Sequence, residues 1–139
     1  MADPKKVAYA DLESIAGTET GVSDWHTIDQ DRVNKFADAT GDHQWIHVDV
    51  ERATKAMGGP IAHGFLTLSL LPMLGGETLN VSGVTRGINY GSDKVRFTNM
   101  VPVGSKVRLR QKCTSVTEKA GGKQMIMENT IEMPNGAGA

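Results

Sequence analysis

One segment of the chain, GFLTLSLLPMLGG at residues 64–76, limits the folds that are available to it. Helical spacing would place apolar side chains on nearly every side of this segment, and a helix that is apolar all round has to be covered all round. The segment is too short to span a bilayer, and Pro72 is expected to kink the helix or end it early. The rest of the chain therefore has to supply a layer that wraps a buried helix.

The second half of the chain offers strands for that layer. Residues 94–98, 105–113 and 124–133 each alternate between apolar and polar positions, which is typical of half-buried strands. The sequence KAGGK at residues 119–123 predicts a hairpin turn between the last two. An antiparallel sheet curled around one helix satisfies every apolar face and predicts an α+β fold. The inward positions of the last two strands are Val107, Leu109, Cys113, Met125, Met127, Ile131 and Met133.

Capping residues define two short helices in the first half of the chain. Residues 23–28 are expected to form a short strand, and the first helix then begins after Asp29 and ends at Gly41. The second helix begins after Asp49 and ends at Gly58.

The tight loop predicted between these helices, GDHQWIHVD, is the first candidate site. Trp45 and Ile46 are expected to anchor the loop in the core, so that Asp42 and His47 can point to one spot. A carboxylate and an imidazole placed in this way can hold one water and move its protons. In the alternative, Asp42 bonds to loop amides and His47 is a buried, hydrogen-bonded histidine. The spacing alone leaves both interpretations open.

A metal site is a further alternative. Asp42, His43, His47 and His63 could supply ligands, but they lack the i, i+4 histidine pair of helical zinc sites, and no cysteine set accompanies them. His43 follows Asp42 directly and is expected to face solvent. We therefore predict no metal.

The second candidate site is the start of the apolar helix, PIAHGF. The first amides of a helix have no partner within it, and with the helix dipole they can hold a developing negative charge. Gly64 would leave its N–H open to a ligand, although a glycine could equally serve close packing. His63 is expected to be neutral at this helix end. Ala62, His63 and Phe65 are candidates for substrate binding.

Composition excludes several classes of function. The net charge of −1 gives no global attraction to nucleic acid or to an anionic membrane. One cysteine, Cys113, excludes an intrachain disulfide and fits a reducing compartment. No segment has the pattern of a signal peptide or a membrane span, so a soluble, cytoplasmic protein is expected. Its 139 residues suit one domain, residues 1–139.

Three segments resemble the MaoC-like dehydratases, the (R)-specific enoyl-CoA hydratases, and in particular the branch named after nodulation protein N. They are WHTIDQDRVNKFADATGDHQWIHVDVERA, GGPIAHGFLTLSLLPML and INYGSDKVRFTNMVPVGSKVRLR. The resemblance implies a hot-dog fold, in which an antiparallel sheet wraps a long central helix, and a homodimer or larger assembly. Asp42 and His47 match the aspartate, four residues and histidine of the family motif, and His63 and Gly64 match its helix start.

The sequence departs from that family at its end. Members that resemble it continue past residue 133 with a turn and a further strand, whereas here NGAGA follows. We expect a sheet without its last C-terminal strand, with an edge that a partner chain or a rearrangement would cover.

The implied reaction is the reversible syn hydration of a trans-2-enoyl thioester to a (3R)-3-hydroxyacyl thioester, in fatty acid metabolism. Asp42 and His47 would share the water, and the Gly64 N–H would hold the thioester oxygen. The substrate would be an acyl-CoA or an acyl-carrier-protein thioester, with no cofactor. The rival functions are a hot-dog acyl-CoA thioesterase, a non-catalytic acyl-CoA-binding module and a metal hydrolase.

Overall fold

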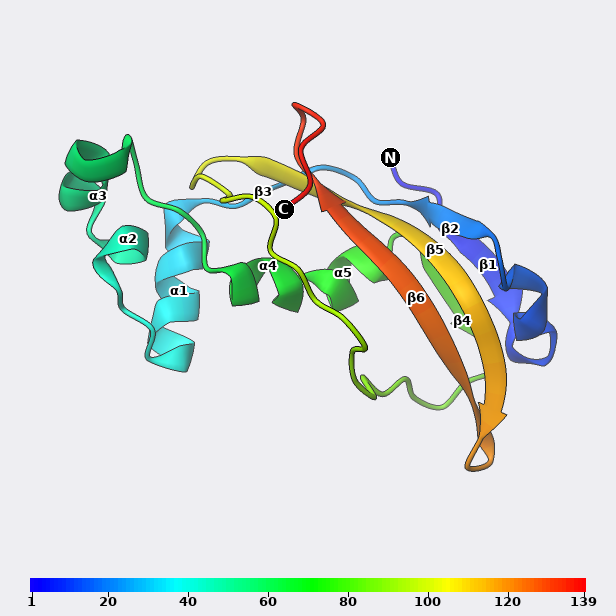
Figure 1. Ribbon diagram of the computed structural model, residues 1–139. Helices are drawn as coiled ribbons and strands as arrows, with labels where there is room; N and C mark the ends of the chain where they lie inside the picture. The colour runs from blue at the N-terminus through cyan, green and yellow to red at the C-terminus, as the bar shows by residue number, and fades with distance from the viewer. The chain divides into compact units, whose positions relative to one another are not determined.

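The computed structural model describes residues 1–139, which form two compact units. The helices and strands of both units are labelled in Figure 1. No helix combines the length and the apolar character that crossing a membrane requires. The first unit comprises Met1–Asp24, Pro72–Arg96 and Arg108–Thr130. The second comprises Trp25–Leu71, Phe97–Val107 and Ile131–Ala139.

The long strand β5 (Lys106–Lys119) is the basis of the sheet in the first unit. Its side chains alternate as predicted, since Leu109 and Cys113 are fully buried while the basic residues between them are exposed or half-exposed. Strand β2 (Glu19–Val22) pairs with it antiparallel, and β6 (Gly122–Glu132) also pairs with it. Figure 1 shows β5 and β6 as a long hairpin whose turn is the predicted KAGGK segment.

A second, two-stranded sheet belongs to the same unit. Strand β1 (Lys5–Ala8) runs parallel to β4 (Leu79–Ser82). The 3-10 helix η1 (Tyr9–Ile15) follows β1 and buries two of its apolar side chains. None of these three elements was predicted from the sequence.

The core of the first unit lies beneath η1. Leu12, Ile15 and Cys113 are its buried centre, and Met125 and Met127 of β6 pack against them as their predicted inward orientation requires. Burial raises the pKa of the Cys113 thiol, because the low-polarity surroundings disfavour the thiolate.

One polar residue interrupts the apolar face of β5. Gln111 is 8 % exposed, and its Oε1 accepts hydrogen bonds from the hydroxyls of Thr20 (2.8 Å) and Thr78 (2.7 Å). Its Nε2 donates to Asn129 (2.9 Å). The buried amide therefore joins three parts of the first unit through side-chain hydrogen bonds.

In the second unit the predicted strand at residues 23–28 is shorter than expected. It is reduced to β3 (His26–Thr27), which pairs with the beginning of β5, where His26 lies opposite Val107. In the first unit, the Ser23 amide still donates to the Leu109 carbonyl of β5 (2.8 Å). Within the first unit, the Asp24 amide donates to the Glu77 carboxylate instead of to a strand, which explains the late start.

Three helices follow, and two of them have the predicted caps. The Asp29 and Asp49 carboxylates each accept a hydrogen bond from the amide three residues later, at 2.9 and 3.0 Å. Gly41 and Gly58 end the same helices with φ of +82° and +85°. The helices are α1 (Gln30–Thr40), α2 (Trp45–Val48) and α3 (Val50–Met57).

The apolar helical segment is divided into two short helices, as expected from the proline at position 72. Helix α4 (Gly64–Ser69) belongs to the second unit, and α5 (Leu71–Gly75) has Pro72 at its second position, where a missing N–H is tolerated. The segment is not buried on every side. Phe65, in the second unit, is 68 % exposed, and Met73, in the first unit, is 41 % exposed.

The strand predicted at residues 94–98 is absent. Residues 84–100 contain no helix or strand, and Ile88, Tyr90 and Phe97 are largely exposed. The alternation of side chains favours an extended backbone, but a strand also needs a neighbour for its hydrogen bonds, and this segment has none.

The end of the chain folds back on β6. Glu132 forms an isolated antiparallel bridge with Gly138, and the Ala139 amide donates to the Ile131 carbonyl (2.8 Å). In the second unit, the tail thus pairs with the end of β6 near Met133, where we expected a partner chain or a rearrangement to cover the edge.

Candidate active site

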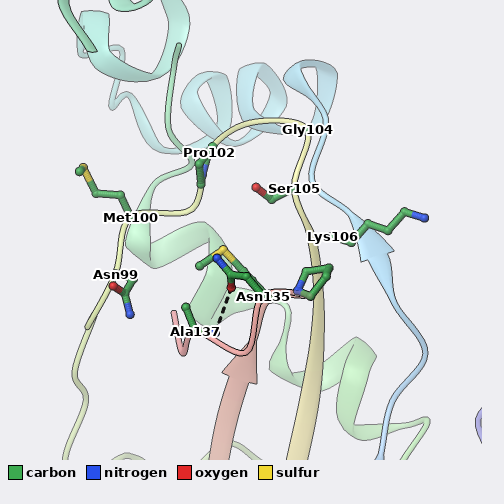
Figure 2. Close-up of a pocket in the computed structure, with 10 residues that line it drawn as sticks. Asn99, Met100, Pro102, Gly104, Ser105, Lys106, Asn135 and Ala137 are labelled. Carbon is green, nitrogen blue, oxygen red and sulfur yellow. Dashed lines mark hydrogen bonds between the residues drawn. The ribbon is translucent and has the colours of Figure 1, made fainter. Parts of the chain in front are cut away.

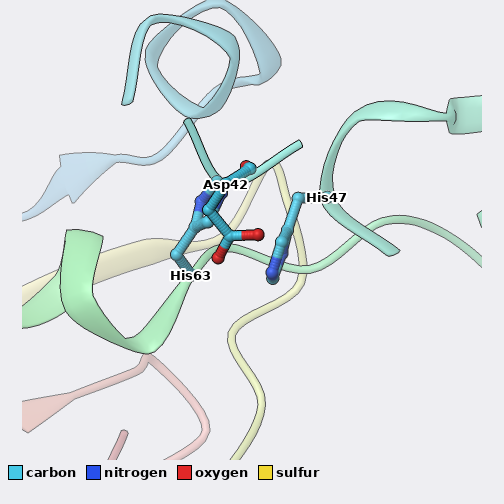
Figure 3. Close-up of side chains that lie close together, drawn as sticks. All are labelled: Asp42, His47 and His63. Atoms are coloured by element: carbon cyan, nitrogen blue, oxygen red, sulfur yellow. The ribbon is translucent and has the colours of Figure 1, made fainter. Parts of the chain in front are cut away.

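Three side chains of the second unit meet at one place: Asp42, His47 and His63 (Figure 3). One nitrogen of each imidazole and one carboxylate oxygen all lie within 4.8 Å of one another. His47 and His63 are buried, with 6 % and 3 % of their surface exposed, whereas Asp42 is half-buried. The cluster therefore combines an accessible acid with two buried imidazoles.

Local structure around His47 differs from the prediction. The expected loop contains one helical turn, α2, and His47 is its buried residue. Trp45 and Ile46, expected in the core, are only half-buried. Trp45 instead packs under the guanidinium of Arg52, which lies 4.2 Å from the ring centroid. The turn thus directs the imidazole inward and leaves the indole near the surface.

The hydrogen bonds of His47 define which nitrogen is free. Its Nδ1 lies 2.6 Å from the carbonyl oxygen of Ile61. A carbonyl only accepts, so Nδ1 carries the hydrogen and, in the neutral ring, Nε2 has a free lone pair. The side chain of Gln30, at the start of α1, donates to the His47 carbonyl (2.9 Å) and so links α1 to the turn that carries His47. His47 therefore offers a proton acceptor at Nε2.

His63 is oriented by the same kind of contact. Its Nε2 donates to the backbone carbonyl of Asp42 (3.0 Å). Its ring stacks on that of His47, with centroids 3.8 Å apart and 24° between the planes, and the Phe36 ring lies 4.8 Å away. The prediction of a structural histidine beside Asp42 agrees with this placement.

The Asp42 carboxylate is only weakly engaged by the protein. Its Oδ1 lies 3.4 Å from the amide nitrogen of Gln44, a long contact for a hydrogen bond. A carboxylate that served to satisfy loop amides would make shorter bonds. The carboxylate therefore keeps oxygen atoms available for a water or a ligand.

His43 is separate from the cluster. It lies on the surface, where its Nε2 is 2.9 Å from the Asp38 carboxylate, and this hydrogen bond raises the pKa of His43. This placement agrees with the expectation that His43 faces solvent.

The cluster offers three potential metal ligands, but its geometry suits a water better. A metal ion lies close to the plane of each imidazole that binds it, at about 2.0–2.1 Å from the nitrogen. The rings of His47 and His63 are stacked and nearly parallel, so one ion cannot lie in both planes. A water held between the Asp42 carboxylate and Nε2 of His47 needs only hydrogen-bond distances of about 2.8 Å, and it accepts a wider range of angles than a metal ion does.

Gly64 begins α4, and its N–H donates to no backbone carbonyl. A Cβ atom at this position would lie only 3.0 Å from Cγ of Phe97, so the glycine also permits close packing. The two interpretations of Gly64 are thus compatible.

The Phe97 ring meets the Phe65 ring edge-on, with the centroids 5.8 Å apart. Ala62 is buried and donates its N–H to a backbone carbonyl.

A separate pocket of about 550 Å³ also lies in the second unit. Residues 99–106 and 133–137 supply its lining, and Figure 2 shows Asn135 accepting a hydrogen bond from the Ala137 amide. None of the residues predicted for the site lines this pocket.

The family model described as "MaoC like domain" matches residues 11–133, which is most of the chain. This chain belongs to the MaoC-like family. Among curated relatives of this MaoC-like protein is 3-hydroxyacyl-thioester dehydratase Z of Mycobacterium tuberculosis, 52 % identical over 132 residues that cover 94 % of the chain and 87 % of the relative. Nodulation protein N of Rhizobium meliloti is 50 % identical and covers 94 % and 83 %.

Solved structures support the predicted fold. An (R)-hydratase from A. caviae involved in PHA biosynthesis superposes with a TM-score of 0.68 at 25 % identity, covering 89 % of each chain. The MaoC-like protein therefore has the hot-dog fold that its sequence predicted, an α+β fold with an antiparallel sheet and helices.

Sequence reasoning missed several residues around the cluster of this MaoC-like protein. The Ile61 carbonyl that orients His47 has no signature in the sequence, because any residue carries one. Phe36 of α1 contacts the His63 ring, and it was not among the predicted site residues. Thr67 is buried in α4 although it is polar, and a polar residue inside an apolar segment was a signal that could have been used.

Proposed function

We propose that this MaoC-like protein is an (R)-specific enoyl-thioester hydratase/dehydratase, a hydro-lyase. Its reaction is the reversible syn addition of water to a trans-2-enoyl thioester, which gives a (3R)-3-hydroxyacyl thioester. The observation that carries the proposal is the weakly engaged Asp42 carboxylate beside the free Nε2 of His47. The names of its relatives, a 3-hydroxyacyl-thioester dehydratase and an (R)-hydratase, support the same class.

In the hydration direction, Asp42 and His47 bind one water between them. One of the two groups accepts a proton from the water as its oxygen attacks C3, and a proton is delivered to C2 on the same face. Such acid–base assistance contributes about 10²–10⁴-fold to the rate. The reverse sequence removes the proton from C2 and expels the 3-hydroxyl as water.

The thioester oxygen gains negative charge during the attack and needs a donor. We assign this task to the Gly64 N–H, at the start of α4, whose lack of a backbone acceptor supports the assignment. One such donor is worth about 10²–10³-fold in rate. The thioester itself delocalises the charge, so the proposed reaction uses no cofactor and no metal. His63, Ala62 and Phe65 are proposed to line the substrate site.

The test is hydration of crotonyl-CoA, followed as the loss of enoyl absorbance, in the wild type and in the Asp42→Asn and His47→Gln variants. We expect turnover by the wild type and losses of at least about 10²-fold in both variants. His43→Gln is the matched control, because it changes a histidine of the same loop outside the cluster, and it should keep full rate. Full activity in Asp42→Asn and His47→Gln would refute the assignment.

The same assay separates the alternatives. A thioesterase would release free thiol from the acyl-CoA, which a thiol reagent detects, and an acyl-CoA-binding module would bind the thioester without turnover. Chelator treatment should leave the rate unchanged, whereas a metal hydrolase would lose it. Comparison of crotonyl-CoA with crotonyl-acyl carrier protein identifies the preferred carrier.

We also propose a cytoplasmic, single-domain protein that assembles into a homodimer or larger homo-oligomer and acts in fatty acid metabolism. The family match across residues 11–133 supports one domain. Exposed apolar side chains in the second unit, at Phe65, Phe97 and Met100, support an assembly that covers them. Sedimentation analysis of the wild type against Phe65→Glu tests it, since a charge at a covered position should shift the protein towards the monomer.

A further inference from the structure

Two buried polar atoms at the start of α4 have no hydrogen-bond partner: Nδ1 of His63 and the hydroxyl of Thr67. Their residues are 3 % and 5 % exposed. His63 is the N-cap of α4, and the Thr67 amide in the first turn donates to the His63 carbonyl (3.2 Å), so the two residues are joined at the helix start. Buried polar groups in folded proteins nearly always have partners, and an ordered water is a frequent one.

Besides its contact with the Phe36 ring, the His63 ring touches both members of the proposed catalytic pair. Its Nε2–H holds the backbone carbonyl of Asp42 at 3.0 Å, and its face packs on His47 with the centroids 3.8 Å apart. A shift of this ring would therefore move both Asp42 and His47.

We propose that His63 is the positioning residue of the Asp42–His47 pair, and that a buried water shared with Thr67 fixes its tautomer. The water donates a hydrogen bond to Nδ1 of His63 and bonds with the Thr67 hydroxyl. With Nδ1 occupied as an acceptor, Nε2 keeps its hydrogen and continues to hold the Asp42 carbonyl. The effect on rate rests on the proposed function, whereas the tautomer does not.

The tautomer is measured first, by nitrogen NMR of the full-length protein labelled at its histidines. We expect His63 to carry its hydrogen on Nε2 in the wild type, and the Nδ1–H form to gain population in Thr67→Val. An Nδ1–H tautomer in the wild type would overturn the proposal. This measurement needs no substrate and holds whatever reaction the protein performs.

The kinetic test uses two substitutions of His63. His63→Phe keeps a ring against His47 but removes both nitrogens, and kcat should fall about 10–100-fold while KM changes little, because misplaced catalytic groups cost about that much. His63→Gln returns an N–H that can reach the Asp42 carbonyl and should recover part of kcat. Ser69→Ala, which removes an exposed hydroxyl from the same helix, is the matched control and should have no effect.

Thr67→Val completes a double-mutant cycle with His63→Phe. Thr67→Val alone should lower kcat, and it should cause no further loss in the His63→Phe background, because it acts through His63. Additive losses would show separate packing effects and overturn the proposal. A wild type without hydratase activity would refute the proposed function only, whereas an inactive Asp42→Asn beside a fully active His63→Phe would refute the positioning role only.

Discussion

At the scale of single residues, the ion pair of His43 and Asp38 makes the stability of the folded state depend on pH. The pair raises the pKa of His43, so it stabilises the folded state at pH values below the unfolded pKa of about 6.5, and this contribution is lost as the pH rises through the folded pKa. We expect an NMR titration of His43 to have its midpoint above 6.5, and Asp38→Asn to lower it. Asp31→Asn, which removes the partner of Lys35 instead, should leave it unchanged.

Substitutions at Gly64 can distinguish its two possible roles, close packing against Phe97 and access of a ligand to its N–H. In Gly64→Ala the added Cβ would meet the Phe97 ring, which is half-exposed and able to move. We expect hydratase activity to fall, and the double variant Gly64→Ala/Phe97→Ala to stay at least about tenfold below Phe97→Ala, because the methyl group also blocks approach to the N–H. Full recovery in the double variant would mean that the glycine serves packing alone.

At the scale of secondary-structure elements, the hairpin turn between β5 and β6 is strained at one residue. Ala120 has φ of +50°, a conformation that costs a residue with a Cβ about 1–2 kcal/mol, and Gly121 follows with φ of +79°. Ala120→Gly should therefore stabilise the protein by about 1 kcal/mol and raise Tm by roughly 3–5 °C. A thermal melt checks this, and Ala120→Val should lower Tm, since a β-branched side chain is worse at positive φ.

Elements that depend on local chemistry were the ones that sequence could predict. The caps at Asp29 and Asp49 and the alternation along β5 are properties of neighbouring residues, and the structure confirms them. The strand predicted at residues 94–98 depends on a partner strand, which no local pattern reveals. The spacing of Asp42 and His47 predicted that the two side chains could point to one spot, and they do lie close together, but their roles were left open by spacing. The backbone carbonyls that orient the two histidines were not predictable, because they have no side-chain signature.

At the scale of the folded molecule, the hydrogen bonds around Gln111 connect strands of the first unit. Gln111→Leu would leave the hydroxyls of Thr20 and Thr78 without their side-chain acceptor in a buried place. We expect a loss of about 1–3 kcal/mol in the free energy of unfolding. Denaturant titration measures it, and Lys112→Gln, at an exposed position next in the strand, should change the stability by less than about 0.5 kcal/mol. An equal effect of both substitutions would contradict the role of the buried amide.

The buried Cys113 has a practical consequence for distinguishing the proposed activities. Thioester cleavage is followed by colour from a reagent that reacts with free thiolate, and a reactive protein thiol would add its own signal. Cys113 is the only thiol of the chain, it is fully buried, and its raised pKa keeps it protonated. While the protein stays folded, Cys113 should therefore not react with the thiol reagent. Any colour then reports coenzyme A released from the substrate. A late rise in the background absorbance would indicate that the protein is unfolding.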